Sequence, residues 1–180
     1  MKPKIRRELF QSIGTATALI VSVLALIVSI YEANLLKAQQ KATVWPYFSV
    51  NEGYDAAGFR INASNNGTGP ALISSVLVEC NGKPFKKYID LLNTIKPNNT
   101  MGYDKIRVSN ISNTVVKAGE ERELLFLPWS DETREILKLM GGKVRIKIQY
   151  CSVLEDCWTY EYPTAERVKE YFKSPMEFDD

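Results

Sequence analysis

The sequence predicts a mainly β protein, with one N-terminal transmembrane helix followed by an antiparallel immunoglobulin-like β-sandwich that carries one or two short helices. Three observations predict this class. The stretch 9–31 contains no charged residue. From Val44 onward, apolar and polar residues alternate with the period of two that is typical of half-buried strands. Turn signals separate these alternating stretches at the spacing expected of a sandwich.

The uncharged stretch is rich in Leu, Ile, Val and Ala, and as a helix it is long enough to cross a hydrocarbon layer about 30 Å thick. A cleaved signal peptide also begins with basic residues and an apolar run. Its run is usually shorter, however, and no small-x-small cleavage pattern follows Tyr31. The sequence therefore favours an uncleaved anchor over residues 9–31, preceded by a basic cytoplasmic segment over residues 1–8.

The flanks of this stretch predict its orientation, because Lys and Arg near a membrane segment tend to stay in the cytoplasm. More basic residues precede the stretch than follow it closely: Lys2, Lys4, Arg6 and Arg7 before, Lys37 and Lys41 after. We expect a single-pass protein with its N-terminus inside and its folded domain across the membrane.

Small residues recur along the predicted membrane helix at steps of three or four positions: Gly14, Ala18, Ser22, Ala25 and Ser29. These steps place them on one face, where close backbone approach lets membrane helices associate. We predict a helix-association surface for a second copy or another membrane protein. The alternative is that small residues are simply common in such helices.

Residues 32–43 contain no Gly or Pro, so the helix is expected to continue as a stalk over this range. Pro46 then ends any helix. The β-sandwich domain is predicted over residues 44–163, followed by a C-terminal helix and an acidic tail over residues 164–180.

Two alternating stretches define the expected core face of the domain: Phe59, Ile61 and Ala63, then Val144, Ile146, Ile148 and Tyr150. Further strands are predicted near residues 46–51, 71–80, 103–109, 121–128 and 156–162. The Asn81-Gly82 pair is a strong hairpin signal.

One helix is predicted from Ser130, a good N-cap, to Gly141, a good exit residue. Its apolar stripe would be formed by Ile136, Leu137 and Met140. Shorter helices are expected over residues 88–95 and 164–173. The last residues of the chain are expected to be frayed.

The stretch 65–71 combines two glycines, two asparagines and a proline, which raises the question of a phosphate-binding loop. Such a loop needs free backbone N–H groups and usually a helix after it, but Pro70 has no N–H and a strand follows. That strand would place Leu72, Val76, Val78 and Cys80 on one face. The stretch therefore predicts a corner between two strands.

The chain contains no histidine, which removes the common triad nucleophiles and most zinc or copper sites. No carboxylate cluster has the ligand spacing of a calcium loop. We expect no enzymatic activity, no metal and no cofactor, and we leave small-molecule binding open. Residues 43–180 carry 17 Lys or Arg against 19 Asp or Glu, so they lack the basic surplus that nucleic-acid binding requires.

Cys151 and Cys157 fall on the polar faces of two successive strands joined by the short loop 152–156. In a domain outside the cytoplasm, this spacing favours a disulfide over free thiols, and a redox or metal role is the remaining alternative. Cys80 is expected to be a buried, inert thiol.

Most aromatic residues of the domain are expected in the core. An exposed recognition edge is predicted where the loop 152–156 meets the following strand. Its candidate partner-binding residues are Val153, Leu154, Glu155, Tyr160 and Tyr162.

The segments QQKATVWPYFSV after the anchor, NNGTGPALISSVLV, CNGKPF and YCSVLEDCW resemble a loose group of small bacterial single-pass membrane proteins with an outer β-sandwich-like domain. The resemblance spans about residues 39–158 and implies fold and location in the bacterial inner membrane. It transfers no functional site.

These features together predict a membrane-anchored, non-enzymatic interaction subunit that presents its β-sandwich to a protein partner in the bacterial envelope. The alternative is a phage-defence or exclusion protein whose clustered helices disturb the membrane. That alternative draws on the same small-residue stripe and on Thr15, Thr17 and Ser22, which make the helix slightly polar.

Overall fold

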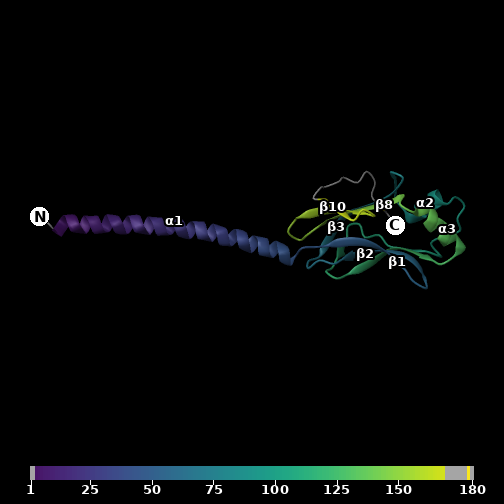
Figure 1. Ribbon diagram of the computed structural model, residues 1–180, viewed down its shortest axis with the longest axis horizontal. Helices are drawn as coiled ribbons and strands as arrows, with labels where there is room; N and C mark the ends of the chain where they lie inside the picture. The colour runs from purple at the N-terminus through teal and green to yellow at the C-terminus, as the bar shows by residue number, and fades with distance from the viewer. Residues whose placement is uncertain (1–2, 169–177, 179–180) are drawn as a thin grey trace. The chain divides into compact units, whose positions relative to one another are not determined.

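The computed structural model describes residues 3–168 and residue 178, and the chain divides into two compact units, Met1–Ala42 and Thr43–Asp180 (Figure 1). The first unit is helical. Within the described residues, the second contains two antiparallel sheets and two short helices. The prediction of a mainly β protein with an N-terminal apolar helix is confirmed at this level.

Helix α1 runs without interruption from Pro3 to Thr43. Proline suits the first turn of a helix, whereas Pro46, three residues beyond the end, cannot continue one. The stretch Ser12–Thr43 is long and apolar enough to cross a membrane, and none of its most apolar part is buried against the rest of the chain. A signal sequence has the same properties, so α1 has the length and composition of a membrane anchor or of a signal sequence.

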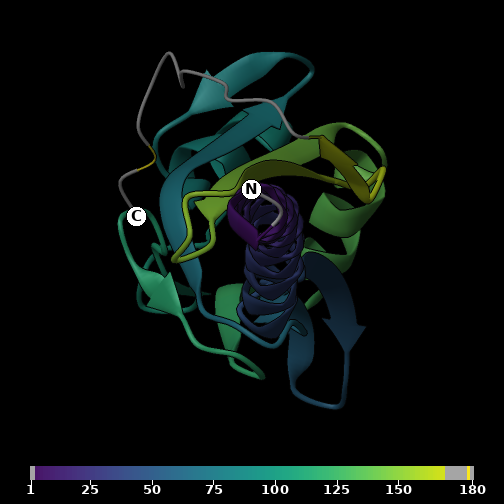
Figure 2. The same ribbon diagram turned by 90° about the vertical axis from the view of Figure 1, so that its left-hand side faces the viewer.

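The second unit, the β-domain, consists of two sheets that face each other across one hydrophobic core. Figures 1 and 2 show the two layers, with β1 in one and β10 in the other. The first sheet has the order β1 (Phe48–Tyr54), β2 (Gly58–Asn65), β7 (Glu121–Pro128), β5 (Arg107–Val108). The second has the order β10 (Glu166–Val168), β9 (Cys157–Tyr162), β8 (Val144–Cys151), β3 (Ala71–Cys80), β4 (Lys83–Phe85), with β6 (Val115–Val116) also paired to β3.

The residues that alternation assigned to the core are buried: Phe59, Ile61, Ala63, Val144, Ile146, Ile148 and Tyr150. They come from β2 and β8, which lie in different sheets. The two sheets therefore bury their apolar faces against each other, as period-two patterning requires.

The hairpin predicted at Asn81-Gly82 joins β3 to β4, with Cys80 paired to Lys83. Asn81 and Gly82 have φ angles of 52° and 78°. Two successive positive φ angles are the property for which an Asn-Gly pair is favoured in two-residue hairpins.

The stretch 65–71 forms a corner between β2 and β3, as predicted. A Cβ atom on Gly67 would collide with the backbone of Trp45 and Tyr47, and one on Gly69 would collide with the backbone of Val44. Glycine is needed at both positions because the corner lies directly against the segment that leads into β1. We call residues 44–47 the leading segment.

Helix α3 (Asp131–Met140) begins at the predicted cap, where Ser130 Oγ accepts a hydrogen bond from the N–H of Thr133 over 2.9 Å. Ile136 and Met140 are buried, whereas Leu137 is half-buried. Helix α2 (Tyr88–Ile95) occupies the range predicted for a second short helix. Figure 1 shows α2 and α3 at the same end of the β-domain.

The prediction of a helix over residues 164–173 is wrong for its first residues, because 166–168 form strand β10 against β9. Ala165 has a φ of 57°, so the chain turns back at this position instead of starting a helix. Residues 169–177 lie outside the described residues. The tail was also expected to be frayed, yet Phe178 is buried with its ring against Tyr88.

Candidate functional site

The predicted helix-association residues all lie on α1, on its exposed surface: Gly14, Ala18, Ser22, Ala25 and Ser29. Their spacing keeps them on one face of the helix. The hydroxyl groups of Thr17 and Ser22 donate to the carbonyls of Ile13 and Ala18 in the preceding turn, over 2.9 and 2.8 Å.

The β8–β9 loop carries the predicted cysteine pair. Cys151 and Cys157 face each other in the register of the two strands, and their sulfur atoms are bonded. Cys80 is a buried free thiol on β3. The bond therefore closes the loop 152–156 at its base.

Ser152 holds the same loop from inside. Its side chain is 3% exposed, and its Oγ accepts hydrogen bonds from the N–H groups of Leu154 and Asp156, over 3.2 and 3.3 Å. The Ser152 N–H donates to the carbonyl of Asp156 over 2.8 Å. The loop is thus fixed by a covalent bond and a set of hydrogen bonds, and its conformation is largely organised in advance.

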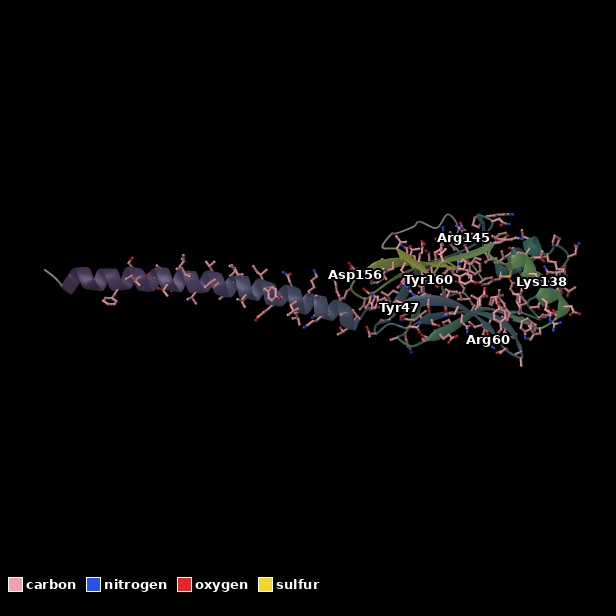
Figure 3. The ribbon with its side chains drawn as sticks, in the orientation of Figure 1. Tyr47, Arg60, Lys138, Arg145, Asp156 and Tyr160 are labelled. Carbon is pink, nitrogen blue, oxygen red and sulfur yellow. A yellow bond between two sulfur atoms is a disulfide. The ribbon has the colours of Figure 1, made fainter. Side chains whose placement is uncertain are left out.

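Val153 and Leu154 are exposed on this loop, by 47% and 42%. Because Cys151 pairs with Leu72 at the start of β3, the loop lies at the same end of the β-domain as the corner 65–70 and the leading segment. Figure 3 shows Asp156 of the loop at the opposite end of the β-domain from Lys138 of α3. We call this end, with residues 44–47 and 152–156, the loop end.

The prediction of one recognition edge that includes Tyr160 and Tyr162 is wrong. Tyr160 is buried, with its hydroxyl donating to the carbonyl of Val50 over 3.3 Å. The β9 edge is covered by β10. Tyr162 lies at the far end of β9 from the loop, about 17 Å along a strand of that length. Of the five predicted residues, only Val153, Leu154 and Glu155 share one exposed surface.

A cavity of about 210 Å³ opens between the two sheets and α3, near that far end of β9. It is lined on one side by Glu52, Tyr54 and Phe59 from the β1–β2 hairpin. The opposite side is formed by Tyr162 with Pro163, by Leu137 and Met140 of α3, and by Gly141, Gly142 and Val144.

Two tyrosines hold the carboxylate of Glu52 in this cavity. The hydroxyl of Tyr54 donates to Glu52 Oε2 over 2.8 Å, and the hydroxyl of Tyr162 donates to Glu52 Oε1. Partial burial, the hydrogen bond to Glu52 and its negative charge raise the pKa of Tyr54 to about 12. The same three causes, in the same order, raise the pKa of Tyr162.

The sequence analysis did not predict the contact of Glu52 with Tyr54 and Tyr162. Glu52 and Tyr54 stand two apart on one strand, so a shared face could have been read from their spacing. Their approach to Tyr162 depends on how the two sheets meet, which no local pattern contains. Among the described residues, no group of three or more His, Cys, Asp or Glu side chains is placed to hold a metal ion.

Comparisons with protein-family models, with curated proteins and with solved structures find no match. Two features of the β-domain are candidates for a functional site. One is the loop end with its exposed apolar residues, and the other is the cavity around Glu52.

Proposed function

We propose that this chain is a membrane-anchored, non-enzymatic interaction subunit, which presents its β-domain to a protein partner in the bacterial envelope. One observation carries the proposal. A helix of 41 residues, apolar enough to cross a membrane, is joined directly to a compact β-domain. An anchor continuous with a folded domain is the expected design of a protein that holds a recognition module at a membrane.

We further propose that the β-domain is an immunoglobulin-like sandwich. In that fold, the strands in chain order A to G form one sheet ABED and a second sheet CFG. Taking β1, β2, β7 and β5 as A, B, E and D reproduces the first order. Taking β3, β8 and β9 as C, F and G reproduces the second, with β4, β6 and β10 as additional strands.

Two features support the compartment that we propose. Four basic residues precede the apolar stretch and two follow it closely, which favours a cytoplasmic N-terminus. The bonded pair Cys151–Cys157 fits an oxidising compartment, such as the bacterial periplasm. Both support a β-domain on the outer side of the inner membrane. A topology reporter fused after Lys41 tests this, and cytoplasmic reporter activity would contradict it.

We assign the partner contact to the loop end. Exposed apolar side chains on a rigid loop favour binding, because little conformational entropy is lost when the partner docks. Val153 and Leu154 meet this description, since the disulfide and Ser152 fix the backbone between them and the strands.

Photocrosslinking in cells tests the assignment. A benzophenone amino acid at position 153 or 154 should give a crosslinked species of one defined mass, which Leu154→Asp should abolish when the probe is at 153. The matched control is position 103, where Tyr103 is 51% exposed outside the loop. Equal crosslinking at 103, or none at 153 and 154, would contradict the proposal.

The alternative of membrane disturbance finds less support. It drew on hydroxyl groups that make the helix slightly polar, but those of Thr17 and Ser22 donate to carbonyls of their own helix. A hydroxyl bonded in this way is partly satisfied without a second helix or water. We therefore do not propose it.

A further inference from the structure

We propose that the cavity around Glu52 is a binding site for an organic cation, which it would take through an alkylammonium group. The inference goes beyond the proposed function and does not rest on it, because neither the membrane nor a protein partner enters the argument. It rests on the juxtaposition of one carboxylate with three aromatic rings among the residues that line a small cavity.

The carboxylate of Glu52 is oriented but keeps spare acceptor capacity. Tyr54 and Tyr162 each donate to a different oxygen atom, while an ionised carboxylate has about four acceptor positions. Within the described residues, Glu52 makes no ion pair with Lys or Arg. A negative charge held in one place without a positive partner is suited to receive a cation.

The two tyrosines remain hydrogen-bond donors to Glu52 over the physiological range. With the pKa of Tyr54 at about 12, and that of Tyr162 also raised, both hydroxyls stay protonated and continue to donate. Their donation fixes the direction of the Glu52 oxygens. The charge is therefore placed before any ligand arrives, which lowers the ordering cost of binding.

The walls of the cavity add a second attraction for the same class of ligand. Tyr54, Phe59 and Tyr162 line it, and the Tyr54 and Phe59 rings lie 5.2 Å apart. Aromatic rings attract alkylammonium groups through the quadrupole of the ring face. Leu137 and Met140 supply apolar surface for the alkyl part of the ligand.

Size and charge favour a small cation. The volume of about 210 Å³ lies below the roughly 300–1,000 Å³ of pockets for drug-sized ligands, so the ligand is a small amine or a single side chain. An anion would meet Glu52 directly. The ammonium group can come from a free amine or from a lysine side chain, and both present the same chemistry.

Titration of the full chain in detergent micelles tests the proposal. The probe is n-butylammonium, and the readout is the ring resonances of ¹³C-labelled tyrosine, assigned by Tyr54→Phe and Tyr162→Phe. We expect saturable shifts of the Tyr54 and Tyr162 resonances at millimolar concentration. The neutral analogue n-pentanol, similar in size, should leave them unchanged, and equal binding of n-pentanol would overturn the proposal.

Glu52→Gln keeps the shape of the side chain and removes its charge, so it should weaken n-butylammonium binding about ten- to a hundredfold. The control is Glu166→Gln, an exposed residue of β10 outside the cavity, which should bind as the unchanged protein does. Binding that survives Glu52→Gln unaltered, or that Glu166→Gln weakens as much, would overturn the proposal.

Tyr54→Phe is a further control for a general effect on folding. It keeps the aromatic ring and removes one of the two hydrogen bonds to Glu52. Because Tyr162 still orients the other oxygen, Tyr54→Phe should weaken n-butylammonium binding less than Glu52→Gln does, and a loss as severe as that of Glu52→Gln would count against the site. Nα-acetyl-lysine methylamide distinguishes the two sources. Tighter binding than n-butylammonium would assign the site to a lysine side chain, and weaker binding would assign it to a free amine.

Discussion

The guanidinium carbon of Arg167 lies 3.8 Å from the centre of the Tyr47 ring. The same guanidinium donates two hydrogen bonds to the carbonyl of Phe48, over 3.1 and 3.2 Å. Arg167 belongs to β10 in one sheet, whereas Phe48 begins β1 in the other and Tyr47 directly precedes it. One side chain thus joins the edges of the two layers at the point where the chain enters the β-domain.

Arg167→Ala should therefore destabilise the β-domain by about 1–3 kcal/mol, through loss of the ring contact and of the charged hydrogen bonds. Arg167→Lys should recover part of this, because an ammonium keeps the charge but not the planar pair of donors. Urea unfolding followed by tryptophan fluorescence measures both. Arg134→Ala, which removes an exposed cation on α3, should change stability by less than about 0.5 kcal/mol. Equal effects at the two arginines would contradict this account.

Asn65 also holds the leading segment against the β-domain, from a buried position in the corner between β2 and β3. Its Oδ1 accepts from the N–H groups of Tyr47 and Gly67, both over 3.1 Å. Its Nδ2 donates to the carbonyls of Gly69 and Val116, over 2.8 and 3.0 Å. The side chain is fully buried, so four backbone groups depend on it.

Asn65→Ala should cost about 3 kcal/mol or more, because several buried backbone groups would lose their partner without access to water. The adjacent Asn66 is a matched control. It is exposed, and its amide donates to Ser49 Oγ over 3.0 Å. Asn66→Ala should fall within about 0.5 kcal/mol of the unchanged protein in the same unfolding experiment. A small effect at both positions would show that the corner does not hold the leading segment.

Local patterns predicted most of the strands, yet they failed where the chain departs from strict alternation. Leu72 was placed on the core face with Val76, Val78 and Cys80. The structure buries Ala71 and Ile73 and leaves Leu72 half-buried, because a register shift lies between Ile73 and Ser75. One extra residue reverses the faces of a strand, and a single polar pair such as Ser74-Ser75 does not reveal it.

Tertiary contacts explain the other features that the sequence did not predict. Phe178 sits in an acidic tail whose composition favours fraying, but Tyr88 offers its ring and Asn110 donates to its carbonyl over 3.0 Å. The Glu52 cavity joins β1 to the end of β9, more than a hundred residues later. Neither contact produces a periodic pattern in the sequence, so both are recognised only in the folded structure.

The disulfide gives a prediction that also tests the compartment. When protein isolated from membranes is denatured without reductant, an alkylating reagent should label one thiol, that of Cys80. Reduction should raise the number to three. Cys151→Ser should release Cys157 and give two labelled thiols without reductant. Mass spectrometry measures the number of alkylated thiols per chain. Three labels without reductant would contradict a periplasmic β-domain.

Loss of the bond should have a modest effect on folding, because it closes a short loop with a sequence separation of 6. The chain-entropy relation gives about 2 kcal/mol for a loop of this length. Cys151→Ser together with Cys157→Ser should lower the free energy of unfolding by that amount. Because Ser152 still holds the loop through its hydrogen bonds, the variant should stay folded. Complete unfolding of this double variant at room temperature would contradict the estimate.

The pair Glu52 and Tyr54 predicts a pH effect above neutrality. A tyrosine in an unfolded chain has a pKa near 10, whereas partial burial and Glu52 raise the pKa of Tyr54 to about 12. Because the folded state holds this proton more tightly, the contribution to stability is fully present below pH 10. It is lost as the pH rises from 10 through about 12.

Glu52→Gln removes the negative charge, and with it the acceptor that most favours the protonated hydroxyl. The pKa of Tyr54 should then move down from about 12 toward its ordinary value, while Glu166→Gln should leave it unchanged. NMR titration of the ¹³Cζ resonance of Tyr54, which Tyr54→Phe removes from the spectrum, measures the shift. If the resonance still titrates near 12 in Glu52→Gln, burial alone sets the pKa, and Glu52 does not hold the two hydroxyls in the way that a preformed cation site requires.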